Sequence, residues 1–363
     1  MEFPFDIFEV ANLLGLEARR YHAKSADYDC PFCDGKGKLN LNVELNAYRC
    51  NKCGNQGGMI DLFCKSTGLA DRRQAYRMLS ERTAYGTTTR EARKKVVSCV
   101  KESTKADIRT LDRCYNALLN CLELQPKHRD NLLKRGLSER IIEANRYKSV
   151  PTAHTDRLIS LLLEREIDLA GVPGFFKDEN GKYKVSIFPL MAGYFVPVYN
   201  ENRQIQAMQI RLDTPLEGKR KYMWLSSAEK NGGCSSNSPV DISGDIGSCK
   251  ALYVTEGALK GHIAHALSGK TFASIAGVSQ MKELEKLLIR LKRAGKCEII
   301  VDALDMDDNE NFHVKEAHEY LVKMASSYGF SAKRITWDRR YKGIDDFLLS
   351  CQRKERRNEN ETM

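Results

Sequence analysis

The chain has 363 residues, of which 42% are hydrophobic, and this length and composition predict two or three globular domains. No apolar run approaches the ~20 residues of a membrane span, and the N-terminal MEFPFDIFEV lacks the basic and then apolar order of a secretory signal. We therefore expect a cytoplasmic protein with no membrane partner. The net charge of +10 favours a polyanionic partner, although a generic basic protein has the same balance.

Composition divides the chain into five parts. Residues 1–83 hold a cysteine cluster between short helical patterns, and residues 84–107 form a polar, Thr-rich linker. Residues 108–250 begin with a helical element and continue as β-type runs separated by turns. Residues 251–353 alternate strand and helix patterns. The charged tail, residues 354–363, is expected to be disordered.

Two C-x2-C pairs, separated by sixteen residues, lie in the first part. Their members are Cys30, Cys33, Cys50 and Cys53. Four thiolates fill a tetrahedral site and suit one structural zinc ion, Zn²⁺, with no position left open for water. The alternating segment LNLNVELNAYRC between the pairs predicts a hairpin, so we expect a zinc ribbon that assists folding and nucleic-acid contact. The other eight cysteines are scattered and are expected to be packing residues.

The middle part contains three β-type runs and a cluster of cations. The runs are KVSIFPL, YFVPVYNENRQIQAMQIRLD and KRKYMWLSS, and the segment 231–248 after them is predicted to be a loop. The cations are Arg211, Lys219, Arg220 and Lys221. They fit either a solvated strand edge or a polyanion-binding surface, and an acidic site nearby favours the second interpretation. Tyr222 or Trp224 supplies an aromatic ring for base stacking.

The βαβαβαβα order of the last part predicts a parallel sheet flanked by helices, with its working edge at the carboxyl ends of the strands. Glu256 ends the first strand, in LYVTEGALKG, and Asp305 and Asp307 leave the third strand as D-x-D. Asp345 follows the fourth strand. If the first and third strands are neighbours, these carboxylates form one site for Mg²⁺ or Mn²⁺. A lone D-x-D also occurs in helix caps, and the calcium-loop alternative lacks the required glycine.

Taken together, these motifs resemble bacterial DNA primases of the DnaG type, with their CHC2-like zinc ribbon and topoisomerase–primase (TOPRIM) domain. CPFC…YRCNKCGNQGGMIDL resembles the zinc ribbon, and FPLMAGYFVPVYNENRQIQAMQIRLD with KRKYMWLSS resembles the basic β region. YVTEGALKG and ALDMD are similar to the two metal motifs. The EG-x-x-K, DMD and KGIDD pattern is most similar to TOPRIM-like domains of phages and integrative elements. The resemblance implies a multidomain α/β fold: a zinc ribbon, a mixed α+β basic middle region and a parallel sheet flanked by helices.

The resemblance also implies residue roles. Glu256 corresponds to the catalytic acid/base, and Asp305 and Asp307 correspond to catalytic Mg²⁺ ligands. The nucleic-acid or nucleotide contacts that it implies are Arg211, Lys221 and Tyr222. The chain departs from the family pattern at Cys33, where a histidine is usual, and in the compressed pair Asp345–Asp346.

Lys260 stands where the family often has an aspartate four residues after the glutamate. The exchange of a negative for a positive charge leaves the number of bound metal ions open. Because Lys260 lies one helical turn past Glu256, it is a candidate contact for a triphosphate, and a surface lysine is the alternative.

The expected function is primer synthesis on single-stranded DNA by two-metal nucleotidyl transfer, for replication of a phage or mobile element. The expected partners are a single-stranded DNA template and nucleoside triphosphates. A replicative helicase or an element-encoded replication protein is a further candidate partner. Two alternatives stay open: a TOPRIM-type metal-dependent nuclease, and a non-catalytic, zinc-containing DNA-binding replication accessory.

Overall fold

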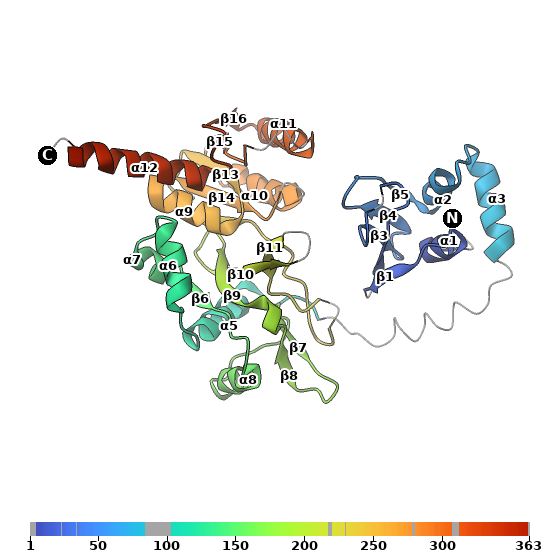
Figure 1. Cartoon of the computed structure of the whole chain (residues 1–363), viewed down its shortest axis with the longest axis horizontal. Coiled ribbons are helices and arrows are strands. Elements are labelled where there is room, and N and C mark those ends of the chain that lie inside the picture. Colours follow the sequence, from blue (N-terminus) through green and yellow to red (C-terminus); the bar gives the residue numbers. More distant parts are fainter. Residues whose placement is uncertain are drawn as a thin grey trace. The chain divides into compact units, whose positions relative to one another are not determined.

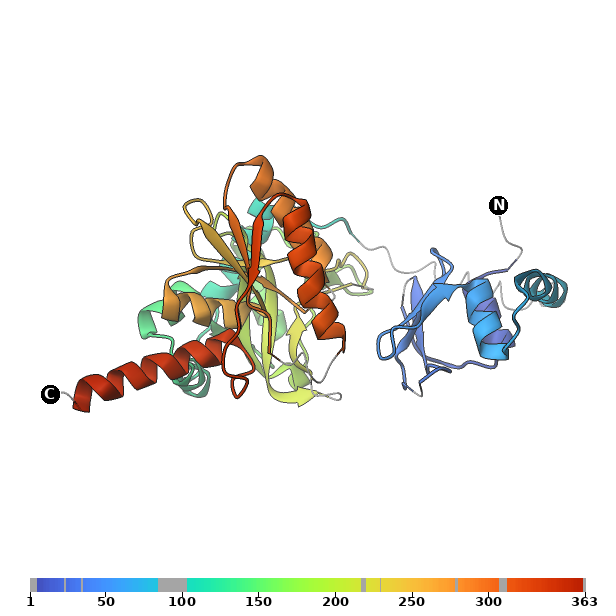
Figure 2. The same cartoon turned by 90° about the horizontal axis from the view of Figure 1, so that it is seen from above.

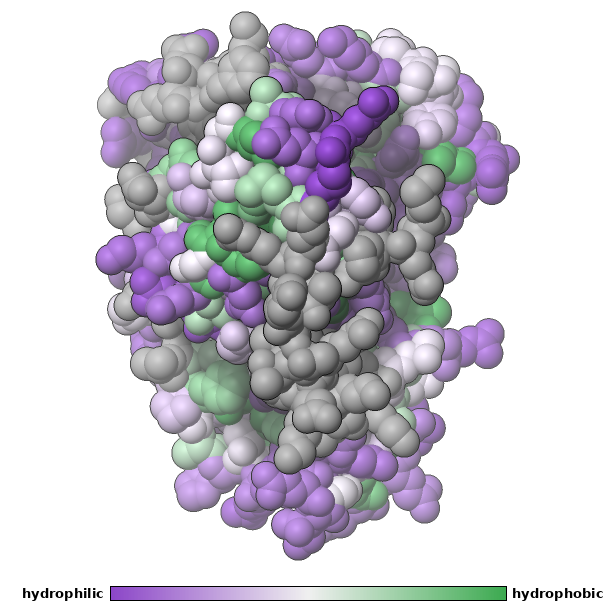
Figure 3. All heavy atoms as spheres, turned by 90° about the vertical axis from the view of Figure 1, so that its right-hand side faces the viewer, coloured by the Kyte–Doolittle hydropathy of each residue, from purple (hydrophilic) through white to green (hydrophobic). Residues whose placement is uncertain are grey.

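The computed structural model describes residues 5–22, 24–33, 35–83, 103–216, 220–228, 230–277, 280–306 and 312–361. Contacts divide the chain into two compact units, residues 1–101 and 102–363. Most of the linker predicted at residues 84–107 lies outside the described residues. Among the side chains coloured in Figure 3, hydrophilic ones predominate, with apolar ones in small groups between them. No helix in the described ranges is long and apolar enough to cross a membrane.

The first unit is an antiparallel sheet with strand order β1-β2-β3-β4-β5, covered by helices (Figure 1). The strands are β1 (Ala18–Tyr21), β2 (Ser25–Tyr28), β3 (Leu39–Asn42), β4 (Ala47–Cys50) and β5 (Gln56–Gly58). The helices are α1 (Ile7–Leu13), α2 (Met59–Thr67) and α3 (Arg72–Thr83). The hairpin predicted between the cysteine pairs is confirmed as β3 and β4, because alternate residues such as Leu39 and Leu41 point into the core.

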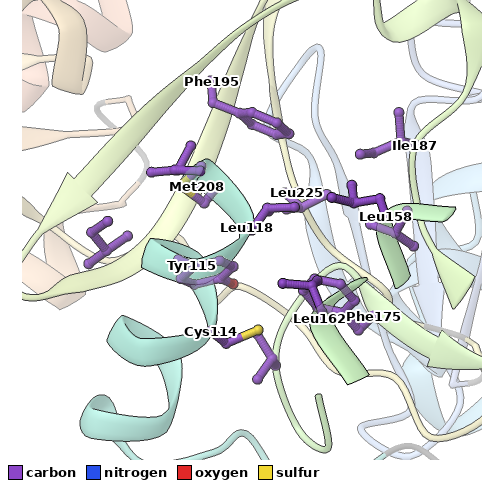
Figure 4. Packing of buried hydrophobic residues seen from close by; sticks show 14 of the residues in the cluster. Cys114, Tyr115, Leu118, Leu158, Leu162, Phe175, Ile187, Phe195, Met208 and Leu225 are labelled. Carbon is purple, nitrogen blue, oxygen red and sulfur yellow. The ribbon is translucent and has the colours of Figure 1, made fainter. Parts of the chain in front are cut away.

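The second unit begins with an antiparallel sheet of order β11-β10-β9-β6. Its strands are β6 (Lys148–Ser149), β9 (Gly193–Tyr199), β10 (Ile205–Leu216) and β11 (Arg220–Trp224), and a separate hairpin is formed by β7 (Phe175–Lys177) and β8 (Tyr183–Val185). The helices are α5 (Ile108–Asn120), α6 (Pro126–Lys134), α7 (Glu139–Ala144) and α8 (Thr155–Glu164), with the short η1 (Pro189–Met191). One face of the sheet packs on α5 and α8, where Tyr115, Leu118 and Leu162 meet Phe195 and Met208 (Figure 4).

The last part of the second unit is a mixed sheet of order β12-β14-β13-β15-β16. Its strands are β12 (Asp241–Ser243), β13 (Ala251–Glu256), β14 (Thr271–Ile275), β15 (Ile299–Asp302) and β16 (Ser331–Arg334). The helices are α9 (Ala258–Ser268), α10 (Met281–Arg293), α11 (Phe312–Ser327) and α12 (Ile344–Glu361). The predicted alternation of strands and helices is confirmed, and the four strands from β13 to β16 pair in parallel (Figures 1 and 2).

Two details of the sequence prediction are wrong. The segment 231–248 is not wholly a loop, because it contains β12, which pairs antiparallel with the edge strand β14. The tail predicted to be disordered from residue 354 is helical to Glu361, because α12 continues through it (Figure 2). Its Lys, Glu and Arg residues have high helix propensity, so a charged composition is compatible with an extended helix there.

Candidate active site and metal centre

The four cysteines of the two C-x2-C pairs converge at one end of the sheet of the first unit. Their sulfur atoms all lie within 4.8 Å of one another, with Sγ of Cys30 3.9 Å from Cys53 and Sγ of Cys33 3.7 Å from Cys50. Burial favours the neutral thiol of Cys50, but the backbone N–H groups of Cys53 and Lys52 outweigh it and lower its pKa to about 7. Four thiols at these distances fit a closed tetrahedral zinc site.

The acidic residues meet at the carboxyl edge of the parallel sheet. Strands β13 and β15 are neighbours, with Val254 opposite Asp302, and the N–H of Ala303 donates to the carbonyl of Val254 at 2.9 Å. Glu256 ends β13 and Asp305 lies three residues past the end of β15, so both leave the sheet at the same edge. Asp307 lies outside the described residues.

The strand-to-helix turn after Glu256 places a lysine over this edge. Gly257 has φ of 83°, a left-handed conformation that a side chain disfavours, and it caps the start of α9. The first turn of α9 then carries Lys260, whose Nζ lies 2.5 and 2.6 Å from the two carboxylate oxygens of Asp305. The side chains of Lys260 and Asp305 are 22% and 5% exposed, so this is a largely buried ion pair.

Three carboxylates act on the ammonium group of Lys260. Burial works against its charge, but Asp305, Asp345 and Glu256 raise the pKa of Lys260 above its usual value. The stability that this charge contributes is therefore fully present below pH 10.5 and is lost only as the pH rises through the raised pKa. The structure thus brings Glu256, Asp305 and Asp345 together, with Lys260 among them.

Asp345 reaches the cluster from the start of α12. Its carboxylate is 1% exposed, and Oδ2 accepts a hydrogen bond of 2.9 Å from Arg135, whereas Oδ1 has no hydrogen-bond partner among the described residues. A Cβ at Gly343 would lie 2.5 Å from this Oδ1 and 3.3 Å from Cδ of Lys260, so the glycine allows the two side chains to approach. Lys342 is a further nearby cation, with its Nζ 3.8 Å from Oδ2 of Asp305.

Arg135, at the end of α6, is the site residue that the sequence did not reveal. Burial disfavours its charge, but Tyr222 and Asp345 raise its pKa above the usual value. Arg135 therefore lies between the β11 strand and the acidic cluster. Because it is separated from Asp345 by 210 positions in the chain, no local motif signals the pair.

The predicted basic surface is brought together only in part. Arg211 is directly opposite Tyr222 on β11 and Tyr194 on β9, and its Cζ lies 5.7 Å from the centre of the Tyr194 ring. Lys221 is exposed and points to the other face of the strand, since successive side chains alternate. Lys219 lies outside the described residues, and Arg220 begins β11.

A buried polar network holds α9 against the middle sheet. Tyr147 Oη and His262 Nδ1 are 2.6 Å apart, and His262 Nε2 lies 3.2 Å from Oδ1 of Asp241. The same Oδ1 accepts the backbone N–H of Tyr199 at 2.9 Å. These contacts fix the first helix of the acidic site relative to β9.

A second polar group borders the face that carries Tyr194. The carboxylate of Asp213 lies 2.6 Å from Nζ of Lys127 and 2.9 Å from Nε2 of His128. Burial raises the pKa of Asp213, but hydrogen bonds and charge from these two neighbours outweigh it, so the pKa is lowered overall. Burial lowers the pKa of His128 and favours its neutral form.

The acidic cluster fits a hard divalent cation by its chemistry, because carboxylate oxygens are the ligands that Mg²⁺ and Mn²⁺ prefer. Oδ1 of Asp345, which no described residue hydrogen-bonds, is one such oxygen. Asp305 is different, since both of its oxygens are bound by the ammonium group of Lys260. A metal ion that used Asp305 would share it with a cation of the chain itself.

Solved structures share this architecture. Aquifex aeolicus primase, represented by its zinc-binding and RNA polymerase domains, is 14% identical, with 98% of this chain and 82% of that chain covered and a TM-score of 0.53. The fold is that of a DnaG-type primase. The RNA polymerase domain of Mycobacterium tuberculosis primase DnaG is 15% identical, with 70% and 82% covered and a TM-score of 0.50. A structure of the same Mycobacterium tuberculosis domain in complex with double-stranded DNA is 14% identical, with 67% of this chain and 78% of that chain covered and a TM-score of 0.51.

No protein-family model matches the sequence, and no curated protein does. The DnaG-type fold is therefore recognised through its arrangement in space. A zinc ribbon at the start of the chain is supported by two findings: the similarity to the Aquifex aeolicus structure, which includes a zinc-binding domain, and the four-cysteine cluster. At identities of 14–15% the likeness establishes the fold, and the reaction has to be argued from the chemistry of the site.

Proposed function

We propose that the chain is a DNA primase that makes short primers on single-stranded DNA by metal-dependent nucleotidyl transfer, for a phage or mobile element. Residues 251–353 are its proposed TOPRIM catalytic domain, and residues 108–250 its proposed nucleic-acid-binding part. One observation carries the proposal: Glu256, Asp305 and Asp345 converge at the edge of a parallel sheet. The DnaG-type fold supports it.

Each residue of the site has a separate proposed role in such a reaction. Mg²⁺ or Mn²⁺ held by Asp345 and Asp305 would lower the pKa of a primer 3′-hydroxyl and offset charge on the attacked phosphate. Glu256, which is partly exposed, is the proposed acceptor of the hydroxyl proton. Lys260 fixes the carboxylate of Asp305. Arg211, beside the ring of Tyr194, is the proposed contact for the template strand.

The test is incubation of the protein with labelled nucleotides, Mn²⁺ or Mg²⁺ and single-stranded DNA of random sequence. We expect labelled products of a few nucleotides, lost in Glu256→Gln and Asp305→Asn. Glu298→Gln is the matched control, because Glu298 is 72% exposed beside the amino end of β15. It should retain wild-type synthesis.

The two alternatives give different results in the same assay. Shortening of the template without labelled product identifies a nuclease. If neither labelled product nor shortened template forms, with the wild type and with Asp305→Asn alike, the chain is a non-catalytic DNA-binding protein. Each of these outcomes contradicts the proposal.

A further inference from the structure

One face of α12 borders a pocket of about 410 Å³. The residues that α12 contributes recur at helical spacing and are Asp346, Leu349, Ser350, Arg353, Lys354 and Arg357. The loop before α12 closes the other side with Arg340 and Tyr341. At 1.5 Å per residue, the face runs for roughly 16 Å, so the pocket has the form of a lined groove. We call it the α12 pocket.

The α12 pocket is predominantly positive. Arg353, Lys354 and Arg357 line it, and neither Lys354 nor Arg357 forms an ion pair with a side chain that the structure describes. Arg353 donates a hydrogen bond of 3.2 Å to the carbonyl of Lys134, which anchors its guanidinium. Arg340 is neutralised by Asp338 at 2.5 Å. Three cations therefore stand against one lining carboxylate, that of Asp346.

The α12 pocket adjoins the acidic cluster. Asp346 lines the pocket, and its neighbour Asp345 is the cluster member bound by Arg135. Asp346 also lies within electrostatic range of Lys260 and Asp305. The positive groove thus begins at the carboxylates and leads away from them along α12.

We propose that the α12 pocket binds the phosphate backbone of a nucleic-acid strand that enters or leaves the acidic site. In duplex-like geometry one strand carries one charge per ~3.4 Å, so a groove of roughly 16 Å spans about five phosphates. From Arg353 to Arg357 the rise is about 6 Å, which matches two of them. An extended groove favours a strand over the compact triphosphate of a free nucleotide. The choice of nucleic acid as the ligand rests on the proposed function.

The test is fluorescence anisotropy of a labelled 16-nucleotide oligo-dT over a range of salt concentrations. The pocket variant combines Arg353→Gln, Lys354→Gln and Arg357→Gln. The control variant combines Lys250→Gln, Arg293→Gln and Lys296→Gln, three exposed cations just before β13, at the end of α10 and between α10 and β15. Both variants lose three positive charges, so the net charge of the protein is matched.

We expect the pocket variant to bind at least tenfold more weakly at low salt, with the salt slope reduced by about 2, since each phosphate contact contributes roughly 0.7. The control variant should change affinity less than threefold. Lys354→Gln with Arg357→Gln leaves the bond of Arg353 intact and should reduce the slope by about 1.4.

Equal losses in the pocket and control variants would overturn the proposal. So would a pocket variant that keeps oligo-dT binding but loses affinity for ATP, measured by calorimetry, because the pocket would then take free triphosphates. A wild-type protein that binds oligo-dT through the α12 pocket but makes no primers leaves this inference standing and contradicts the proposed function alone.

Discussion

Lys260→Met tests whether the ammonium of Lys260 provides the charge that Asp305 requires. The substitution keeps an unbranched side chain of similar length but leaves Asp305, 5% exposed, without its closest cation. Loss of one partner from a buried ion pair costs about 3–5 kcal/mol, because the remaining charge is left uncompensated. Lys342, at 3.8 Å and 62% exposed, offsets a part of this cost. We therefore expect a loss of about 3 kcal/mol at pH 7.

Urea and thermal unfolding measure this loss. For a unit of this size about 3 kcal/mol corresponds to a fall in Tm of roughly 6–12 °C. Mn²⁺ at 100 times its Kd for the variant should then stabilise the variant by about 2.7 kcal/mol, and the wild type by less. Lys286→Met is the control, since Lys286 is 64% exposed and paired on the surface, and it should cost less than about 1 kcal/mol.

Two results would refute the reasoning about Lys260. One is a loss of less than about 1 kcal/mol in the free energy of unfolding, which would mean that water or another cation already compensates the charge of Asp305. The other is an equal effect of Mn²⁺ on the wild type and the variant, which would mean that the ammonium does not compete with a divalent cation.

Three further predictions concern the rest of the chain. Cys50→Ala should abolish binding of one zinc ion per chain, measured by metal analysis, whereas Cys64→Ala, outside the cluster, should retain it. Asp213→Asn should cost about 1–2 kcal/mol at pH 7. Because the folded-state pKa of Asp213 is lowered, this difference from wild type should be fully present above the usual carboxyl pKa of 3.8, begin to shrink below it and be lost as the pH falls through the lowered value; equal losses at pH 3 and 7 would contradict it. Tyr147→Phe should cost about 1–3 kcal/mol in urea unfolding, because it leaves the buried His262 without its 2.6 Å partner; a neutral result would mean that water replaces the hydroxyl.

The position of the acidic site was predictable because it depends on topology. Alternating strands and helices require parallel pairing, and parallel strands bring their carboxyl ends to one edge. That rule places Glu256 and Asp305 together once β13 and β15 are neighbours. The cysteine spacing predicted the zinc ribbon for a similar reason, since two C-x2-C turns supply four ligands at short range.

Other features depend on tertiary contacts that no local pattern encodes. Strand β12 has three residues in a segment rich in Gly and Ser, and it is a strand because β14 provides an edge for pairing. Arg135 joins the site because α6 packs near the start of α12, far away in the chain. The placement of Lys221 and Tyr222 on opposite faces, in contrast, is predictable from the sequence, because successive side chains of a strand point to opposite faces.

The charge of the acidic cluster distinguishes this chain from the pattern that it resembles. Among the described residues, four carboxylates and three cations meet there: Glu256, Asp305, Asp345 and Asp346 with Lys260, Lys342 and Arg135. Their formal sum is about −1, whereas an aspartate at position 260 would make it −3, a difference of one divalent cation. In the proposed function, uncompensated carboxylates would repel a polyanionic substrate, so with Lys260 the chain would need one divalent cation fewer to reach the same local charge. Titration of Mn²⁺ binding should therefore find one more ion per chain in Lys260→Asp than in the wild type, and equal numbers would mean that the lysine leaves the metal site unchanged.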